Sequence, residues 1–225
     1  MTRASETSIA VGDHRRVSAL LLEPEASRCL LVFAHGAGAG MRHATIETFA
    51  RGVAGFRIAT LRFQFPYTEA GRRRPDPPLV LHRTVRAAVA HARAMRPELQ
   101  LLAGGRSMGG RMASSADAVD SLGVAGFVFQ AFPLHPPGKP GTSRADHLSQ
   151  VEKPMLFLSG TRDRLADPEL LAGVRDRLGP RARLHLVDGG DHSLQVLKRS
   201  GRRQEDVDYE VAEAVSEWCR EVLGF

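Results

Sequence analysis

Short apolar runs alternate with longer amphipathic stretches along most of the chain. The apolar runs lack the alternation of a half-buried sheet, so they predict strands that are buried on both faces. These runs cover 29–34, 56–61, 99–103, 124–129, 155–159 and 182–187. Apolar residues at helical spacing predict helices at about 43–52, 79–96, 168–178 and 204–223, and another that begins after Ser107. The mixed segment 9–23 predicts one or two antiparallel strands, and 62–78 reads as a loop.

Alternation of strands and helices is typical of a mostly parallel sheet with helices on both faces, which is an α/β fold. A chain of 225 residues with 43% hydrophobic content fits one domain with a sizeable core. We therefore treat 1–225 as a single domain.

Targeting signals are not evident in the sequence. No apolar run approaches the ~20 residues of a membrane span, and the first residues are too polar for a signal peptide. Cys29 and Cys219 lie at opposite ends of the chain, and we interpret both as reduced structural residues. We expect a cytoplasmic protein with no membrane partner.

The charge of the chain raises the possibility of nucleic-acid binding, because the net charge is +6 and the pI about 10.1. However, the basic residues are spread along the chain, and all but three of them are arginine, a bias that a GC-rich coding genome explains. No aromatic residues alternate with the dense basic runs at 72–74 and 198–203 to stack on bases. We assign these runs to solvated loops and expect no nucleic-acid partner.

The pentapeptide Gly105-Arg106-Ser107-Met108-Gly109 lies where a strand should end and a helix begin. A G-x-S-x-G sequence in that context places its serine on a strained turn with an accessible hydroxyl. A side chain at either glycine would collide with the neighbouring strand or keep the helix from packing closely. The motif indicates a nucleophilic serine, and the alternative is a glycine-rich loop with an incidental serine.

Functional loops of a parallel sheet lie beyond the carboxyl ends of its strands, so partners for Ser107 are sought there. His192 follows the strand at 182–187 and is our candidate general base, with His135 in a proline-rich loop as a competitor. Asp163 follows the strand at 155–159 and could orient the histidine and stabilise its positive charge. Asp191 is a fallback for that role.

Two backbone amides are candidates for stabilising an oxyanion. The amide of Met108 begins the helix after the nucleophile, and the amide of Ala37 belongs to the glycine-rich turn after the strand at 29–34. The alternative for that turn is a phosphate-binding loop. It lacks the Lys-Ser/Thr ending of a P-loop, and no acidic residue of a dinucleotide fingerprint is evident.

The four strand-end stretches that hold these candidates, at 35–38, 107, 160–163 and 188–192, together resemble the α/β-hydrolase superfamily. The stretches 31–38, 104–110, 132–139 and 160–163 resemble more narrowly its small lidless dienelactone-hydrolase-like group. That group includes the hydrolase-like domain of a subunit of the NSL chromatin complex. The resemblance implies an α/β-hydrolase fold with an eight-stranded type of sheet, and hydrolysis of esters or thioesters. Dienelactone hydrolase has a cysteine nucleophile where this chain has Ser107, so dienelactone is not the expected substrate.

The site is expected to be open, because the segment between the strands near 129 and 155 is too short for the helical cap domain of related enzymes. We predict that 64–78 and 133–142 form the walls of the pocket. Arg106, His35 and His135 are candidates for substrate binding. For Arg106 two arrangements stay open, contact with an anionic substrate and a salt bridge to a neighbouring loop.

These features predict a serine hydrolase that cleaves small carboxyl esters or thioesters through an acyl-enzyme and needs no metal or other cofactor. In this hypothesis Ser107 attacks, His192 transfers the proton, and Asp163 orients His192. The partner is a small-molecule substrate, and we expect a monomer or homodimer. The alternative is a non-catalytic scaffold or interaction module with the same fold.

Overall fold

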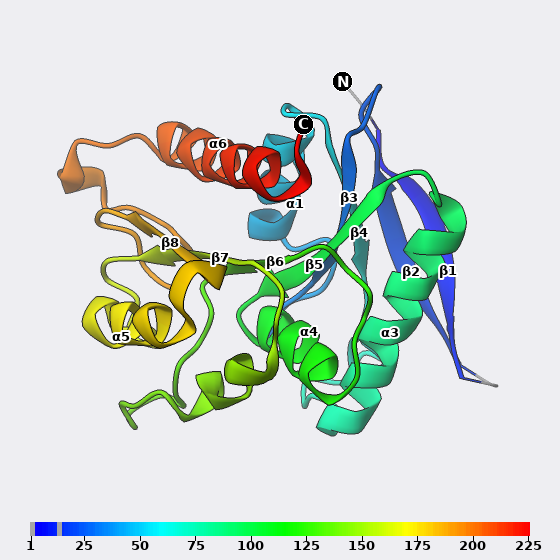
Figure 1. The fold of residues 1–225 in the computed structure, drawn as a ribbon, viewed down its shortest axis with the longest axis horizontal. Helices are drawn as coiled ribbons and strands as arrows, with labels where there is room; N and C mark the ends of the chain where they lie inside the picture. Colours follow the sequence, from blue (N-terminus) through cyan, green and yellow to red (C-terminus); the bar gives the residue numbers. More distant parts are fainter. Residues whose placement is uncertain (1–2, 13–14) are drawn as a thin grey trace.

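A computed structural model describes residues 3–12 and 15–225, and its strands form one sheet in the order β1-β2-β4-β3-β5-β6-β7-β8 (Figure 1). The strands are β1 (Ser5–Val11), β2 (Arg15–Leu22), β3 (Cys29–Ala34), β4 (Ile58–Phe63), β5 (Gln100–Arg106), β6 (Phe127–Gln130), β7 (Met155–Gly160) and β8 (Ala182–Val187). The two N-terminal strands pair antiparallel, β2 pairs antiparallel with β4, and the ladder from β4 to β8 is parallel. The predicted mostly parallel sheet is confirmed.

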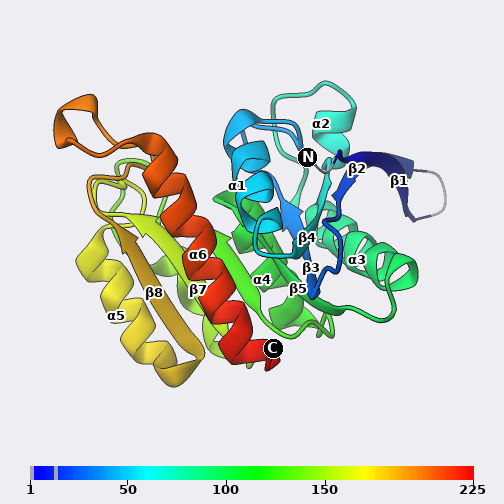
Figure 2. The same ribbon diagram turned by 90° about the horizontal axis from the view of Figure 1, so that it is seen from above.

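Helices cover both faces of the sheet, as Figures 1 and 2 show. One face carries α1 (Ala44–Ala54) and α6 (Gln204–Leu223), which pack against each other; the other carries α3 (Pro78–Met95), α4 (Met108–Val119) and α5 (Pro168–Leu178). Alternate residues of each strand therefore belong to different cores. In β3, Leu30 and Val32 pack on the side of α3 to α5, whereas Leu31 and Phe33 pack on the side of α1 and α6.

Strand boundaries differ from the sequence expectation where the backbone turns sharply. The strand expected at 56–61 begins at Ile58, because Arg57 lies in a turn with φ of 62°. The strand expected at 124–129 begins at Phe127. The strand before the serine is longer than expected, since Gly105 and Arg106 remain paired in the sheet, opposite Ala34 and Gln130.

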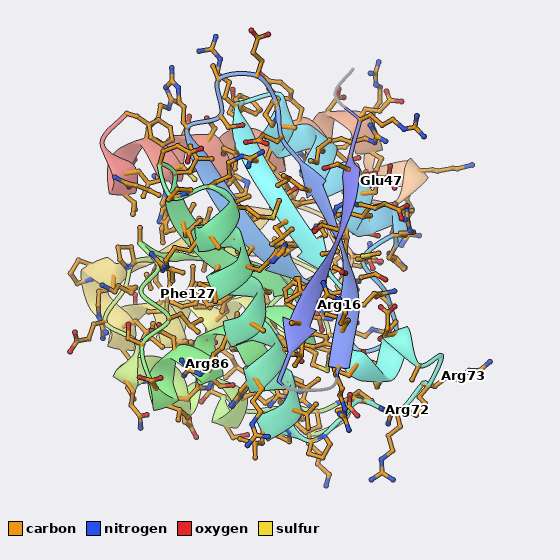
Figure 3. The ribbon with its side chains drawn as sticks, turned by 90° about the vertical axis from the view of Figure 1, so that its right-hand side faces the viewer. Arg16, Glu47, Arg72, Arg73, Arg86 and Phe127 are labelled. Carbon is orange, nitrogen blue, oxygen red and sulfur yellow. The ribbon has the colours of Figure 1, made fainter. Side chains whose placement is uncertain are left out.

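The segment expected as a loop at 62–78 contains the end of β4 and a short helix, α2 (Pro66–Glu69). After α2, Arg72 and Arg73 extend from the surface, as expected of a solvated loop (Figure 3). The connection from β6 to β7, residues 131–154, holds a 3₁₀ helix, η1 (Ser143–Gln150), in place of a cap domain. Shorter 3₁₀ turns lie at η2 (Gly179–Arg181) and η3 (Lys198–Ser200).

Cys29 at the start of β3 and Cys219 on α6 are both buried and free of disulfides. The fold brings these distant positions together, and the neighbouring thiol of Cys29 together with burial raises the pKa of Cys219. In the part of the chain that the structure describes, no helix has both the length and the apolar character that a membrane crossing requires.

Candidate active site

Ser107 occupies a sharp turn between β5 and α4. Its φ of 52° and ψ of −118° lie in a region that L-amino acids rarely adopt, which costs about 1–3 kcal/mol and is characteristic of functional sites. Backbone hydrogen bonds on both sides hold the turn. The Ser107 amide donates to the carbonyl oxygen of Gln130 at 2.8 Å, and the Arg111 amide donates to the carbonyl oxygen of Ser107 at 3.2 Å.

The glycines of the motif are required by the end of β3. A Cβ atom at Gly105 or at Gly109 would overlap the carbonyl oxygen of Ala34 well inside van der Waals contact. Because the colliding atom is backbone, no side-chain rotation would relieve the overlap. The expected collision with the neighbouring strand is therefore confirmed for both positions.

The structure brings Ser107, His192 and Asp163 into one hydrogen-bonded chain. His192 Nε2 lies 2.9 Å from Ser107 Oγ, and His192 Nδ1 lies 2.9 and 2.8 Å from the two carboxylate oxygens of Asp163. An ionised carboxylate only accepts hydrogen bonds, so Nδ1 carries the proton and Nε2 is free to accept the serine hydroxyl. The side chain of Asp163 is fully buried, whereas that of His192 is 25% exposed.

Two other aspartates near these loops have structural tasks. The Asp191 carboxylate accepts the backbone amides of Ser193 and Gln195 at 2.7 and 3.0 Å, so it shapes the loop that carries His192. Among the described residues, the hydrogen bonds of the histidine ring to a carboxylate go to Asp163 and not to Asp191. Asp167 accepts the amides of the first turn of α5 and is the N-cap that its position before Pro168 suggests.

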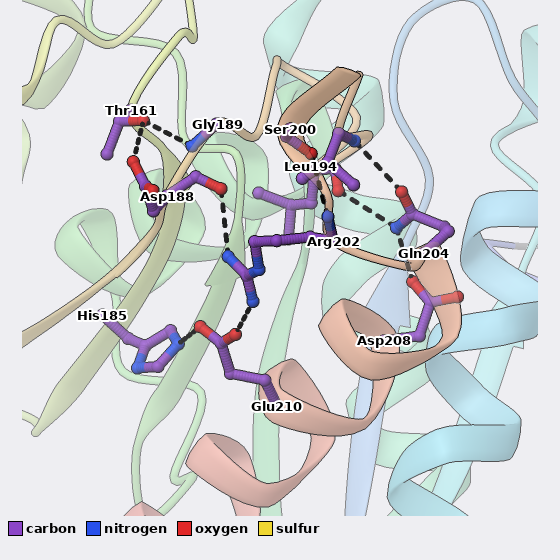
Figure 4. Close-up of polar contacts among 11 residues, drawn as sticks. Thr161, His185, Asp188, Gly189, Leu194, Ser200, Arg202, Gln204, Asp208 and Glu210 are labelled. Carbon is purple, nitrogen blue, oxygen red and sulfur yellow. Dashed lines mark hydrogen bonds and ion pairs between the residues drawn. The ribbon is translucent and has the colours of Figure 1, made fainter. Parts of the chain in front are cut away.

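The loop after β8 that carries His192 is braced against the start of α6 (Figure 4). The Gln204 side chain donates to the carbonyl oxygen of Leu194 at 3.1 Å and accepts the Val196 amide at the same distance. Arg202 donates to the carbonyl oxygen of Asp188 at 3.0 Å and forms an ion pair with Glu210. Arg202 thus departs from the expected solvated basic run, because it is half-buried and holds this loop.

Arg106 also holds the loop of His192. Its guanidinium donates to the Ser193 hydroxyl at 2.7 Å and to the carbonyl oxygen of His192 at 3.3 Å. Burial lowers the pKa of Arg106, and the negative charges of Asp191 and Asp163 oppose that shift. The sequence left two arrangements open for Arg106, contact with an anionic substrate and a salt bridge to a neighbouring loop. In the structure Arg106 contacts a neighbouring loop, through hydrogen bonds and not through a salt bridge. The position of Arg106 at the end of a strand marks it as a candidate site residue. The sequence does not show that its side chain points toward the loop of His192.

The turn after β3 lies beside the nucleophile. A Cβ atom added at Gly36 would be 3.6 Å from Ser107 Cβ, and the Tyr67 hydroxyl donates to the carbonyl oxygen of Ala37 at 3.0 Å. Within the described residues, neither the Ala37 amide nor the Met108 amide donates a hydrogen bond. Met108 is the first residue of α4, where backbone amides lack helical partners. Both amides stay candidates for the oxyanion site.

The structure contradicts a substrate-binding role for His35. Its side chain is fully buried, its Nε2 accepts the Phe65 amide at 3.1 Å, and its Nδ1 lies 2.8 Å from the carbonyl oxygen of Gly36. Burial lowers the pKa of His35 to about 4, so the ring is neutral near pH 7. With both nitrogens occupied inside the protein, His35 instead fixes the turn that contains Ala37.

His135 is nearly buried in the connection from β6 to β7. Its Nδ1 lies 2.8 Å from the carbonyl oxygen of Pro136, and its own carbonyl oxygen accepts Arg144 Nη1 at 3.0 Å. The Ser107 hydroxyl pairs with His192 and not with His135, which removes the competitor for the role of base. Substrate contact by His135 stays a prediction.

A pocket of about 290 Å³ lies behind the loop of His192, between α1 and α6. Gln130, Ser193, Leu194 and Asp208 contribute to its lining, and neither of the segments expected as pocket walls does. No group of three or more His, Cys, Asp or Glu side chains with the arrangement of a metal site occurs among residues 3–12 and 15–225.

A family model described as an alpha/beta hydrolase domain matches residues 27–220. The chain belongs to this family. Among solved structures, a dienelactone hydrolase from Anabaena variabilis is 19% identical over 98% of both chains, with a TM-score of 0.76. Est1E from Butyrivibrio proteoclasticus with bound ferulic acid is 16% identical over 97% of this chain and 100% of that one, with a TM-score of 0.78.

A serine hydrolase without a lid from Xanthomonas campestris is also similar to this α/β hydrolase. The two are 20% identical, the match covers 97% of this chain and 96% of the Xanthomonas chain, and the TM-score is 0.75. At identities this low, the structural match establishes a shared fold. The resemblance to small lidless dienelactone-hydrolase-like proteins is thereby confirmed at the level of architecture.

Proposed function

We propose that this α/β hydrolase cleaves small carboxyl esters or thioesters through an acyl-enzyme on Ser107. The observation that carries the proposal is the hydrogen-bonded chain from Ser107 through His192 to the buried carboxylate of Asp163. Serine is a weak nucleophile by itself, and an adjacent base that a carboxylate holds in one tautomer activates it. Esterases and a serine hydrolase among the structural neighbours support the same reaction class.

Acylation begins when Ser107 Oγ attacks the carbonyl carbon and His192 Nε2 accepts the hydroxyl proton. The carbonyl π electrons move to oxygen and form the oxyanion of a tetrahedral intermediate. Collapse of that intermediate breaks the bond to the alcohol or thiol, and His192 returns its proton to the leaving group. Asp163 stays ionised and stabilises the imidazolium that forms between these two steps.

Stabilisation of the oxyanion is assigned to the amides of Met108 and Ala37. Both belong to backbone fixed by the fold, so little reorganisation is needed when charge develops; loss of one such donor typically costs about 10²–10³ in kcat. Deacylation repeats the sequence with water. His192 accepts the proton of water, the hydroxyl oxygen attacks the acyl carbon, and the proton returns to Ser107 as the carboxylic acid leaves.

The test combines a fluorophosphonate probe with hydrolysis of p-nitrophenyl esters of increasing chain length. We expect the wild-type protein to be labelled and active, and Ser107→Ala to lose labelling and at least about 10³-fold in kcat/KM. Ser115→Ala is the matched control, because Ser115 Oγ lies 2.7 Å from a ring nitrogen of His82, in a pair without an aspartate. A wild-type protein that is neither labelled nor active would refute the proposal in favour of a non-catalytic scaffold.

A further inference from the structure

Two neighbouring guanidinium groups, one of them a single helical turn from the proposed nucleophile, lack acidic partners. Arg111 lies in the first turns of α4 and Arg144 in η1, and neither forms an ion pair with a carboxylate of the described residues. Arg111 Nε is buried and has no hydrogen-bond partner within them. Within the described residues, the Arg144 guanidinium donates to one backbone oxygen, that of His135. An unbalanced, partly buried pair of cations is costly unless an anion completes it.

The contact between α4 and η1 brings these two side chains near each other. Ser114 Oγ lies 2.8 Å from His147 Nε2, which fixes the two segments against each other. Arg111 precedes Ser114 by three positions and Arg144 precedes His147 by three, so each lies about one turn from this contact. Burial is the main cause of the lowered pKa of Arg111, and the positive charge of Arg144 lowers it further.

Arg111 lies at the end of α4 that follows Ser107. Arg111 is one helical turn, about 5.4 Å along the axis, beyond the nucleophile, and its amide donates to the Ser107 carbonyl oxygen. Side chains on a helix lean toward its N-terminus, so Arg111 leans toward the turn of Ser107. Arg106, the arginine singled out by the motif, differs from this pair because its guanidinium donates to the loop of His192 and the charges of Asp191 and Asp163 act on it.

We propose that Arg111 and Arg144 bind an anionic group of the substrate, a carboxylate or a phosphate, so that this α/β hydrolase prefers esters with a negative charge close to the scissile bond. The inference rests on the proposed function and names its substrate class. Arginine suits this task because its planar donors match the oxygens of either anion. The charge belongs to the acyl or to the alcohol part of the ester, and matched substrates distinguish the two.

The experiment compares kcat/KM for two pairs of esters. Mono-p-nitrophenyl glutarate against p-nitrophenyl pentanoate tests a charged acyl group, and 4-acetoxybenzoate against its methyl ester tests a charged alcohol. We expect the wild-type protein to favour the charged member of one pair by about 10- to 100-fold, as for charge-assisted hydrogen bonds. Arg111→Gln and Arg144→Gln should each lower kcat/KM for the charged member far more than for the neutral member, and so remove most of that preference.

Arg83→Gln, an exposed arginine on α3, changes the net charge equally and should keep the preference. Equal rates within both pairs in the wild-type protein, or a preference that survives in both variants, would overturn the inference while the hydrolase activity stands. Absence of labelling and of hydrolysis of every ester would instead refute the proposed function. The rate with the neutral ester reports whether a variant is folded. If Arg111→Gln also loses the rate with the neutral ester, the variants at Arg144, the more exposed of the two positions, test the inference. Arg144→Lys should then retain part of the preference that Arg144→Gln loses.

Discussion

Two of the serine–histidine pairs in this α/β hydrolase have nearly equal geometry but different surroundings. Ser107 lies 2.9 Å from His192, and Ser114, two turns further along α4, lies 2.8 Å from His147. Behind His192 stands the buried carboxylate of Asp163. His147 lies near Arg111 instead: burial first and then the charge of Arg111 lower its pKa to about 4, and the carboxylate of Asp146 opposes the shift. A short contact between serine and histidine is therefore insufficient to define a catalytic pair.

The serines differ as strongly as the histidines. Ser107 is on a strained turn whose backbone places the hydroxyl beyond the edge of the sheet. Ser114 lies inside a regular helix, is fully buried, and its Oγ is also 3.2 Å from the carbonyl oxygen of Gly110. Such a bond to the preceding turn is common for a helical serine and leaves it no access to a substrate. The second pair joins α4 to η1, whereas the first has the arrangement expected of a nucleophile and its base.

Substituting Asp163→Asn would make the first pair resemble the second and should have the largest effect on activity. The asparagine amide donates to His192 Nδ1, which moves the ring proton to Nε2 and prevents it from accepting the proton of Ser107. We expect kcat to fall about 10⁴-fold while the fold is retained. Steady-state hydrolysis of p-nitrophenyl esters and the rate of fluorophosphonate labelling measure it.

Asp167→Asn is the matched control, since it makes the same chemical change on the same connection between β7 and α5, and asparagine is an equally good N-cap. Its activity should equal that of the wild-type protein. If Asp163→Asn kept kcat within tenfold, the assignment of Asp163 as the orienting carboxylate would be wrong.

A smaller effect is expected from Arg106→Gln, which removes hydrogen bonds that hold the loop of His192. Because Arg106 acts through the position of the histidine, we expect kcat to fall about 10- to 100-fold with KM nearly constant, in line with loss of charge-assisted hydrogen bonds. Ser193→Ala, which removes only one of the accepting groups, should lose less. A rise in KM for anionic esters with kcat unchanged would show that Arg106 binds substrate.

The contrast between the two pairs also shows what the sequence can predict. Strands buried on both faces are continuous apolar runs, so the sheet and the ends of its strands are readable, and Ser107, Asp163 and His192 all lie at those ends. Strand-end position places a Cα atom but not the direction of its side chain. For that reason the prediction of a substrate ligand at His35, which follows β3, is wrong, because the ring points into the protein.

Contacts that depend on packing between distant irregular segments are not predictable in this way. The segment that forms η1 has no apolar periodicity, so the contact of His147 with α4 leaves no signal in the sequence. The same holds for Arg202, whose basic run resembles a solvated loop until the fold supplies Glu210 as its partner. Local pattern identifies elements and strand ends, while side-chain partners require the three-dimensional arrangement.

The smallest expected effect concerns the second pair and appears in stability. The pKa of His147 falls from its ordinary value of 6.5 to about 4 in the folded protein, mainly through burial, so the unfolded chain binds more protons between these values. The stability that the neutral ring contributes is therefore present above pH 6.5 and is lost as pH falls toward 4.

His147→Gln cannot titrate and can still bond Ser114. Since the ring is only partly enclosed, we expect the variant to lose about 1–2 kcal/mol less than the wild-type protein over that range, measured by urea unfolding at pH 7 and pH 4.5. His35 titrates in the same range in both proteins and cancels in the comparison. Equal losses in the two proteins would mean that His147 is not held neutral by its surroundings, and the proposed difference between the two histidines would fail.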